Sequence, residues 1–259
     1  MRSAIVRASA VAVLAIATLA AAADNGTTTE ALTIGTLVKA LFTTTDGRVV
    51  RVESAIYPRE LVTFRVLDWP FGGPRGETVR RSLQAGVLAA VDGGYIVNGH
   101  PDGLLEIGGR VHEPPVARLS GVVGSAKDDT PIVAPVRDVG AASLRDAIQS
   151  GPFVVDPGGA IGIRRDDGTR ARRALVIVGD GSIGFAITSD CGLSELARAL
   201  VASPRVFGVE HVERALNLSG DGAAGLAVRL PNDRVESVPE LTRLRTVLQI
   251  VKRASATAP

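Results

Sequence analysis

The sequence has little cysteine, few aromatic residues and almost no net charge, and each shortage excludes something. Cys191 is the only cysteine in 259 residues, which excludes an internal disulfide and a cysteine-based zinc site. Aromatic residues make up only 3% of the chain, so alanine, valine, leucine and glycine must fill the core. A formal charge of +2, with no basic stripe interleaved with aromatic residues, argues against a nucleic-acid partner.

The longest apolar run lies at the N-terminus. Two arginines in MRSAIVR precede the run ASAVAVLAIATLA, and the small residues of AAAD follow it. This order is typical of a signal peptide, here cleaved after Ala22 or Ala23. The alternative is a membrane anchor, but the run is shorter than the ~20 residues that a spanning helix needs. We therefore expect residues 1–23 to be a signal peptide, with export to the periplasm or secretion and no stable membrane insertion after processing.

The remaining sequence has the pattern of one strand-rich domain. We expect a flexible polar lead-in over 24–30 and one folded domain over 31–259. Amphipathic spacing predicts helices over 76–86, 143–151 and 193–203, and apolar runs predict strands over 48–55, 61–69, 87–91, 173–178, 183–189, 212–218, 225–230 and 246–253. Residues 120–142, rich in glycine, proline and small residues, are expected to form an irregular surface excursion. Because helices are few and do not alternate regularly with strands, the predicted fold class is α+β, with short helices packed on the sheet.

Two glycine clusters each follow a short apolar strand: AAVDGGYIVNGHPDG over 89–103 and LNLSGDGAAG over 216–225. Glycines at strand ends let backbone N–H groups converge without obstruction by Cβ atoms, which is one way to hold an anion or a sugar phosphate. The alternative is a pair of tight hairpin turns, because glycine after a strand is usually turn chemistry. The residues by themselves leave both interpretations open.

The order of several motifs favours the first interpretation. AVDGGY, AIQSGPFVVDPGG, RRALVIVGDGSIGFAIT, GLSELARAL and ALNLSGDGAA resemble the successive motifs of the phosphodiester glycosidase family, over about residues 60–253. That family shows an Asn-Gly-Gly-aromatic loop, a Gly-Pro pair, an arginine heading a strand and a Leu-Asp-Gly-Gly-Gly-Ser loop. The resemblance implies hydrolysis of a glycosidic bond whose leaving group is a phosphate ester.

The two loops depart from the family pattern in their acidic residues. Asp92 stands where the family has asparagine, and Ser219 stands where the last motif has aspartate. The acid of the last motif is moved two positions to Asp221, and Ala223 and Ala224 replace the serines that follow. These departures keep a second hypothesis open, a catalytically degenerate envelope protein that binds a phosphosugar or glycan without cutting it. A third is a plain envelope scaffold with no small ligand.

The implied reaction needs a carboxylate near the sugar C1 atom and donors or cations around phosphorus. The resemblance implies catalytic roles for Asp221, Asp92 and Arg172, with Asp102 and Glu106 as further carboxylates. It implies substrate contacts by the following residues: Gly93, Gly94, Tyr95, His100, Gly151, Arg173, Ser219, Gly220 and Gly222.

Plainer alternatives stand beside these roles. The arginines of RRDDGTRARR also suit a solvated hairpin, His100 an exposed turn before proline, and Cys191 a buried thiol instead of a nucleophile. We expect no cofactor and no zinc, because no His-x-x-x-His pattern occurs, while carboxylates and backbone oxygens leave a calcium ion open.

Overall fold

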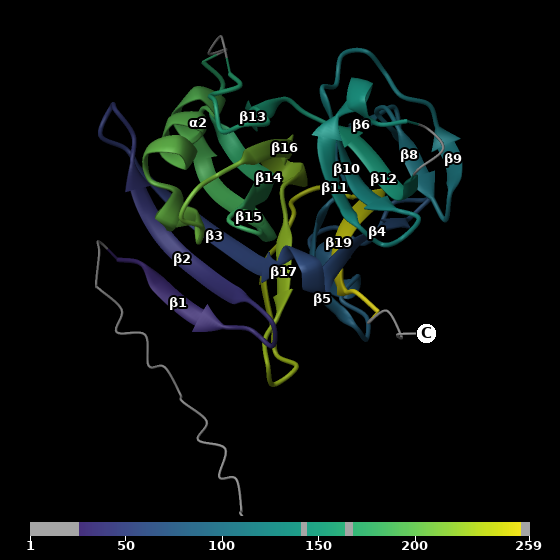
Figure 1. Ribbon diagram of the computed structural model, residues 1–259, viewed down its shortest axis with the longest axis horizontal. Coiled ribbons are helices and arrows are strands. Elements are labelled where there is room, and N and C mark those ends of the chain that lie inside the picture. Colours follow the sequence, from purple (N-terminus) through teal and green to yellow (C-terminus); the bar gives the residue numbers. More distant parts are fainter. Residues whose placement is uncertain (1–25, 141–143, 164–167, 255–259) are drawn as a thin grey trace, which may run out of the picture.

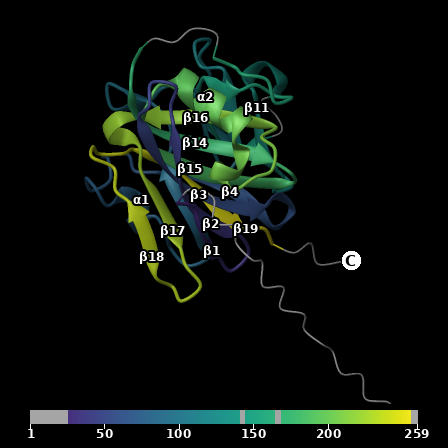
Figure 2. The same cartoon turned by 90° about the vertical axis from the view of Figure 1, so that its left-hand side faces the viewer.

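The computed structural model describes residues 26–140, 144–163 and 168–254, so the expected signal peptide at 1–23 lies outside the described residues. Strands dominate, and every strand pairing is antiparallel. Three large sheets surround the middle of the molecule, together with a small two-stranded hairpin (Figures 1 and 2). The expected α+β fold class, rich in strands with a few short helices, is confirmed.

The largest sheet carries one of the two glycine clusters. Its strands, in spatial order, are β1 (Thr28–Ala31), β2 (Thr36–Thr43), β3 (Val49–Pro58), β15 (Ser182–Cys191), β14 (Ala171–Gly179), β16 (Arg214–Gly220) and β13 (Phe153–Val155). The sheet starts at Thr28, inside the segment expected as a lead-in, because β1 pairs along its whole length with β2. All four residues of β1 are exposed, so pairing and not burial holds this edge.

The other two large sheets carry the start of the AIQSGPFVVDPGG motif, in β12, and the start of the AVDGGY motif, in β5. The second sheet has the order β11 (Pro131–Pro135), β10 (Gly121–Ala126), β12 (Leu144–Ser150), β8 (Leu105–Ile107) and β9 (Arg110–Glu113). The third has the order β18 (Val235–Val238), β17 (Leu226–Arg229), β5 (Val87–Asp92), β19 (Thr246–Lys252) and β4 (Val62–Asp68). A hairpin of β6 (Ile96–Val97) and β7 (His100–Pro101) follows the first glycine cluster.

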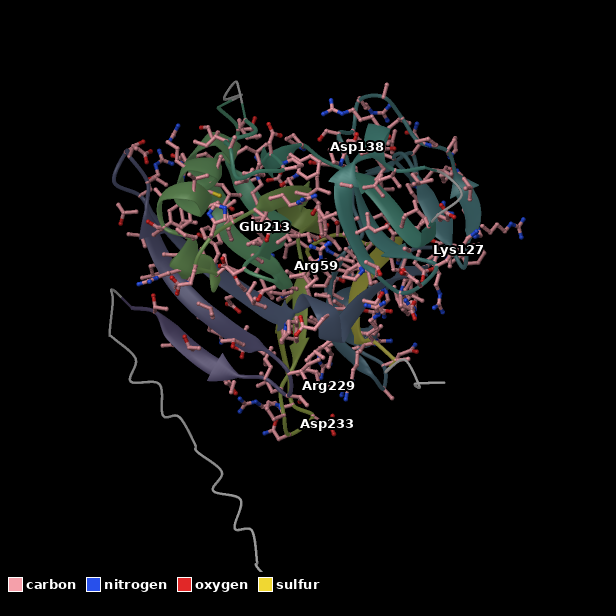
Figure 3. All side chains as sticks on the ribbon, in the orientation of Figure 1. Arg59, Lys127, Asp138, Glu213, Arg229 and Asp233 are labelled. Atoms are coloured by element: carbon pink, nitrogen blue, oxygen red, sulfur yellow. The ribbon has the colours of Figure 1, made fainter. Side chains whose placement is uncertain are left out.

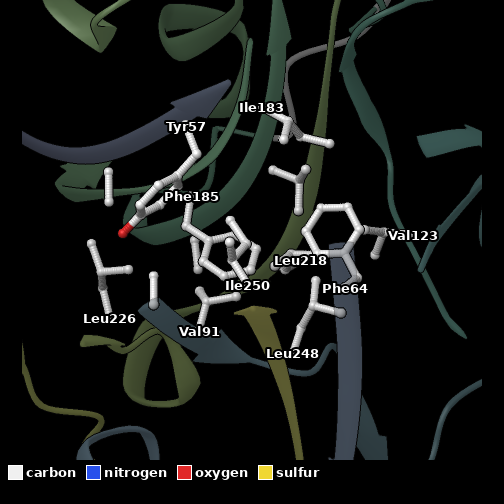
Figure 4. Close-up of a cluster of buried hydrophobic side chains, with 14 of the residues drawn as sticks. Tyr57, Phe64, Val91, Val123, Ile183, Phe185, Leu218, Leu226, Leu248 and Ile250 are labelled. Atoms are coloured by element: carbon white, nitrogen blue, oxygen red, sulfur yellow. The ribbon is translucent and has the colours of Figure 1, made fainter. Parts of the chain in front are cut away.

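One apolar core joins the three large sheets (Figure 4). Phe185 from the first sheet stacks on Phe64 from the third, with ring centroids 5.9 Å apart. Val123 from the second sheet and Leu218 from the first are buried in the same cluster. Because three sheets share these contacts, the ends of their strands are held at fixed positions relative to one another.

Helices are short. These are α1 (Thr78–Arg81) and α2 (Leu193–Ala202), with 3-10 turns η1 (Arg59–Leu61), η2 (Val136–Asp138), η3 (Pro204–Phe207) and η4 (Asp221–Ala223). Helix α2, expected over 193–203, buries Leu196 and Leu200 in a second core against the outer side of the largest sheet. Glu195 Oε2 accepts a hydrogen bond from the Gly192 amide at 2.8 Å, which caps the start of the helix.

Two sequence-based predictions of local structure are wrong. Residues 143–151 were expected to form a helix, but Leu144–Ser150 is the central strand β12. Ile148 enters the main core while Ala147 packs on the opposite side of the sheet. A strand that is buried on both faces loses its polar alternation, so its apolar spacing can match that of a helix.

The second wrong prediction concerns 120–142, which was expected to be irregular and instead contains β10, β11 and η2. Two of its glycines, Gly121 and Gly124, allow close packing against β10. A Cβ atom at Gly121 would lie 2.4 Å from Leu216 Cδ1, and one at Gly124 would lie 2.0 Å from the Asp146 carbonyl oxygen. Glycine is therefore needed here where chains approach closely, although it resembled turn composition in the sequence.

Among the described residues, no helix is both long and apolar enough to cross a membrane.

Candidate functional site

The two glycine-rich segments lie directly against each other, although more than a hundred residues separate them. The Gly225 amide donates to Asp92 Oδ1 at 3.3 Å, and the Asp92 amide donates to the Gly225 carbonyl at 3.4 Å. Asp92 ends β5 and Gly225 follows η4 after β16. This pair continues the antiparallel ladder of β5 with β17 (Leu226–Arg229) inside the third sheet. The contact with the first sheet is made by Ser219, near the end of β16, whose hydroxyl lies beside the Asp92 carboxyl.

Asp92 is fully buried at this junction. Burial raises the pKa of its carboxyl to about 7, and the Ser219 hydroxyl and the Gly225 amide counteract part of that rise. Oδ2 is buried and makes no hydrogen bond with the described residues. A carboxyl with a pKa near neutrality and an unused oxygen is suited to accepting or donating a proton at physiological pH.

A third chain segment completes the cluster. Asn217 Nδ2 donates to the Tyr95 hydroxyl at 2.7 Å and to the Gly151 carbonyl at 3.2 Å, and Tyr95 donates to the same carbonyl at 3.1 Å. Ser150 Oγ donates to the carbonyls of Asn217 and Leu218, at 3.0 and 2.7 Å. The Gly151–Pro152 bond is cis. These contacts bring one segment from each large sheet into a single polar cluster.

The two candidate arginines lie in different surroundings. Arg172 is partly exposed, and its Nη1 donates to the carbonyls of Ala224 at 3.4 Å and Pro239 at 2.8 Å. Its guanidinium thus lies beside the residue that precedes Gly225, and both bonds use Nη1 only. Arg173 is 7% exposed, donates to the Thr169 carbonyl at 3.2 Å, and packs its Nη1 against Gly220. Arg172 is therefore the arginine better placed to meet a ligand.

The first glycine pair is largely engaged within the protein. The Gly93 amide donates to the Thr246 carbonyl at 2.9 Å, and Thr246 Oγ1 donates to the Gly93 carbonyl. Gly94 has φ +91°, and its backbone N–H helps to lower the pKa of the Asp92 carboxyl. In this conformation the Gly93 amide already has an acceptor, so it is not free to donate to an anion, and a substrate contact at Gly93 stays a prediction.

The second glycine pair brackets an exposed acid. Asp221 is exposed with φ 54°, and Ala224 donates to its backbone carbonyl at 3.3 Å. The carbonyl of Gly222 accepts hydrogen bonds from the amides of Leu241 and Thr242. Asp221 therefore lies on the outer side of the loop, whereas Asp92 and Ser219 lie inside it.

Three other candidates lie outside the cluster. His100 is exposed in the hairpin, 3.2 Å from Glu113 Oε1. Asp102 forms an ion pair with Arg118. Glu106 is buried in the second sheet, where burial raises the pKa of its carboxyl. His100, Asp102 and Glu106 follow the first glycine pair closely in the sequence, but they do not lie in the cluster. After Tyr95 the chain runs away from the cluster into the β6–β7 hairpin and β8.

Two surface clefts formed by the described residues differ in how they lie relative to the cluster. One of about 520 Å³ is lined by Ser120, Phe153 and Asp156 among others, next to Gly151. A larger groove of about 1140 Å³ runs between the end of β2 and α2, and none of its lining residues belongs to the polar cluster. The smaller cleft is therefore the one adjacent to the candidate site.

Cys191 is fully buried, and burial raises the pKa of its thiol. Its hydroxyl neighbour is Thr188, 3.3 Å from the sulfur. This environment disfavours the thiolate that a nucleophile would need. No group of three His, Cys, Asp or Glu side chains among the described residues is arranged to hold a metal ion.

Sequence reasoning missed Asn217 and Ser150. Asn217 stands inside the apolar run LNL, where a polar amide in a buried strand was a signal that could have been used. Ser150 was hidden because its segment was predicted to be a helix.

No protein-family model matches the sequence, and no curated protein matches it. The structure is similar to the catalytic domain of zebrafish N-acetylglucosamine-1-phosphodiester alpha-N-acetylglucosaminidase auto-inhibited by its pro-peptide, with TM-score 0.63 and 16% identity over 90% of this chain and 86% of that chain. It is also similar to a hypothetical protein from Synechocystis, with TM-score 0.62 and 13% identity over 90% of this chain and 65% of that chain. The chain thus has the phosphodiester glycosidase-like fold that its motifs indicated.

Proposed function

We propose that this chain is an exported hydrolase that cleaves the bond between a sugar C1 atom and a phosphate in a glycosyl phosphodiester. The single observation that carries the proposal is the buried Asp92 carboxyl, with a pKa of about 7, where the two glycine-rich segments meet. The fold shared with a phosphodiester glycosidase catalytic domain supports the same chemistry. Proposed with it are the signal peptide at 1–23 and the single domain at 31–259.

In the proposed reaction, water adds to C1 while the C1–O bond breaks and its electron pair goes to the phosphate oxygen. Asp92 Oδ2 accepts the proton that water loses, because that oxygen makes no hydrogen bond with the residues that the structure describes and the pKa of the carboxyl suits a base near neutral pH. The products are a free sugar and a phosphate monoester, which leaves readily without a strong acid.

Arg172 has the complementary role. Its guanidinium has five N–H donors, and within the described part of the chain the bonds to Ala224 and Pro239 leave Nε and Nη2 without an acceptor. A planar guanidinium suits two phosphate oxygens, whose negative charge grows as the C1–O bond breaks. Asp221 does not share the junction, so the acid we assign to the reaction is Asp92.

The test is release of N-acetylglucosamine from a small N-acetylglucosamine-1-phosphodiester by the purified chain and two matched variants. Asp92→Asn keeps the shape of the side chain and removes the base, so release should fall at least a hundredfold. Asp221→Asn changes an exposed acid in a conformation that asparagine also adopts, so release should stay within about twofold. Loss of release in Asp221→Asn alone would reassign the base, and no release from the unaltered chain would reject the hydrolase.

A second candidate function is binding of a phosphosugar without cleavage. The observation that favours it is that Asn217 Nδ2, the Tyr95 hydroxyl and the Gly151 carbonyl already bond to one another, so these three groups are occupied within the protein. Ala223 and Ala224 add no hydroxyl groups to the final loop. Saturable binding of the phosphodiester with no sugar released at any pH between 5 and 9 would select this function.

A further inference from the structure

We infer that the 520 Å³ cleft beside Gly151 binds an uncharged sugar, which is one end of the proposed phosphodiester substrate. The inference rests on the proposed function and adds to it where the sugar lies. Two lining residues adjoin Gly151: Ser120 Oγ accepts a hydrogen bond from the Phe153 amide at 3.2 Å, and the same oxygen would lie 2.9 Å from a Cβ atom at Gly151. The carbonyl of Gly151 is the acceptor that Tyr95 and Asn217 share. The cleft is therefore one residue away from the polar cluster.

The wall of the cleft is held in place by a buried side chain. Gln149 is 8% exposed, and its Nε2 donates to the carbonyls of Val116 at 2.6 Å and Leu119 at 2.8 Å. Its Oε1 accepts from the Val116 amide at 2.8 Å. The segment that supplies Ala117, Leu119 and Ser120 to the cleft is thus fixed by hydrogen bonds. A preformed cleft loses less entropy when a ligand binds.

The charges around the cleft favour hydroxyl groups over phosphate. Among the described residues, Arg137 is the one cation that lines it, and its Nε lies 3.6 Å from Asp138 Oδ1. Asp156 adds a second carboxylate. Asp138 lies at the upper side of the molecule in the view of Figure 3. Two acids against one base repel an anion, while carboxylate oxygens accept hydrogen bonds from sugar hydroxyls.

The other side of the cluster suits the phosphate. Along β16, the cleft adjoins Asn217 through Gly151, Ser219 lies next to Asp92, and Arg172 contacts Ala224 beyond the end of the strand. A cleft suited to hydroxyl groups, a carboxyl and a guanidinium therefore follow one another in that order. A glycosyl phosphodiester has the same order of a neutral ring, a reacting C1 atom and an anionic group.

The test is binding of N-acetylglucosamine to the full chain, measured by calorimetry and by ligand-observed NMR. Ala117 is an exposed lining residue, so Ala117→Trp fills the cleft and should weaken binding at least tenfold. The matched control is Ala202→Trp, which fills the larger groove beside α2 and should leave the affinity unchanged. Asp156→Asn changes the side-chain shape less and should weaken binding about threefold. This variant keeps the inference testable if Ala117→Trp does not fold.

The charge of the ligand provides an independent test of the inference. N-acetylglucosamine 6-phosphate should bind several-fold more weakly than the neutral sugar, and tighter binding of the phosphate would overturn the inference. So would the absence of measurable sugar binding at 50 mM, or a loss of binding in Ala202→Trp but not in Ala117→Trp and Asp156→Asn.

The two proposals fail separately. Suppose that the sugar binds, that Ala117→Trp weakens this binding, and that the chain cleaves no phosphodiester. The cleft inference then stands and the hydrolase proposal is rejected. If the phosphodiester is cleaved and Ala117→Trp leaves KM unchanged, the cleft inference falls alone.

Discussion

Asn217 Nδ2 donates a hydrogen bond to the Tyr95 hydroxyl at 2.7 Å, across 122 residues of sequence. The bond joins the end of the third sheet to the middle of β16 in the first, and the shared acceptor at Gly151 adds the second sheet. A site with donors from three sheets depends on the packing of all three.

Tyr95→Phe tests the hydrogen bonds among Tyr95, Asn217 and Gly151. The variant loses the hydroxyl that accepts from Asn217 and donates to Gly151, so the free energy of unfolding should fall by about 1 kcal/mol. Sugar release should fall at least tenfold, because Asn217 and Gly151 lose their common partner. Tyr57→Phe is the matched control: its hydroxyl donates to Leu88 at 3.3 Å, outside the cluster. Urea denaturation should show a similar loss of stability for Tyr57→Phe, with activity retained. Equal activity of the two variants would contradict the assignment.

The pH dependence of stability should report Asp92. Its carboxyl has a pKa of 3.8 in the unfolded chain and about 7 when folded, so the folded state binds the extra proton between these values. Stability is therefore lost as pH rises from about 4 to 7, by an amount on the order of 4 kcal/mol. Asp92→Asn removes this loss. Thermal melting should show the variant more stable than the unaltered chain at pH 8, with a difference that shrinks towards pH 4.

The pH dependence of activity should have the opposite sign. A base must be ionised, so kcat/KM should rise with pH and level off above about 7, the pKa of Asp92. A rate that falls through the same pH range would make Asp92 a proton donor instead. The profile is measured with an N-acetylglucosamine-1-phosphodiester over pH 5 to 9, together with light scattering to exclude aggregation.

Gly94→Ala tests the first glycine-rich bend. Gly94 has φ +91°, and an added Cβ would lie 3.4 Å from the Gln149 carbonyl oxygen and 3.7 Å from Ser150 Oγ. We expect a loss of about 1–2 kcal/mol in the free energy of unfolding, from backbone strain and crowding together. Gly99→Ala is the control, because Gly99 has φ +82° with nothing within 4 Å of the new atom. A loss as large in Gly99→Ala would attribute the effect to the backbone alone.

Arg172→Gln and Arg173→Gln should separate activity from stability. Arg172 is partly exposed beside Ala224, so its replacement should lower kcat/KM more than tenfold while the melting temperature changes by a few degrees. Arg173 is buried between Thr169 and Gly220, so its replacement should lower the melting temperature more. The reverse pattern would move the phosphate contact to Arg173.

The sequence by itself determined most of the strands, helix α2 and the fold class. Alternation over β3, β4, β14 and β15 reflects local geometry, since successive side chains of a strand face opposite sides. The glycine-rich bends that follow β5 and β16 were also predictable, because glycines cluster directly after both strands in the sequence.

Only the tertiary structure decided which of the candidate residues come together. The strand β12 could not be told from a helix because both of its faces are buried, and Ser150 and Gln149 were missed with it. The sequence also did not show which carboxyl is buried, because Asp92 and Asp221 both stand in glycine-rich loops. Of these two, the packing of the three sheets leaves Asp221 exposed and buries Asp92. Burial then changes its pKa, because removing water disfavours the charged form, and no local sequence pattern encodes that environment.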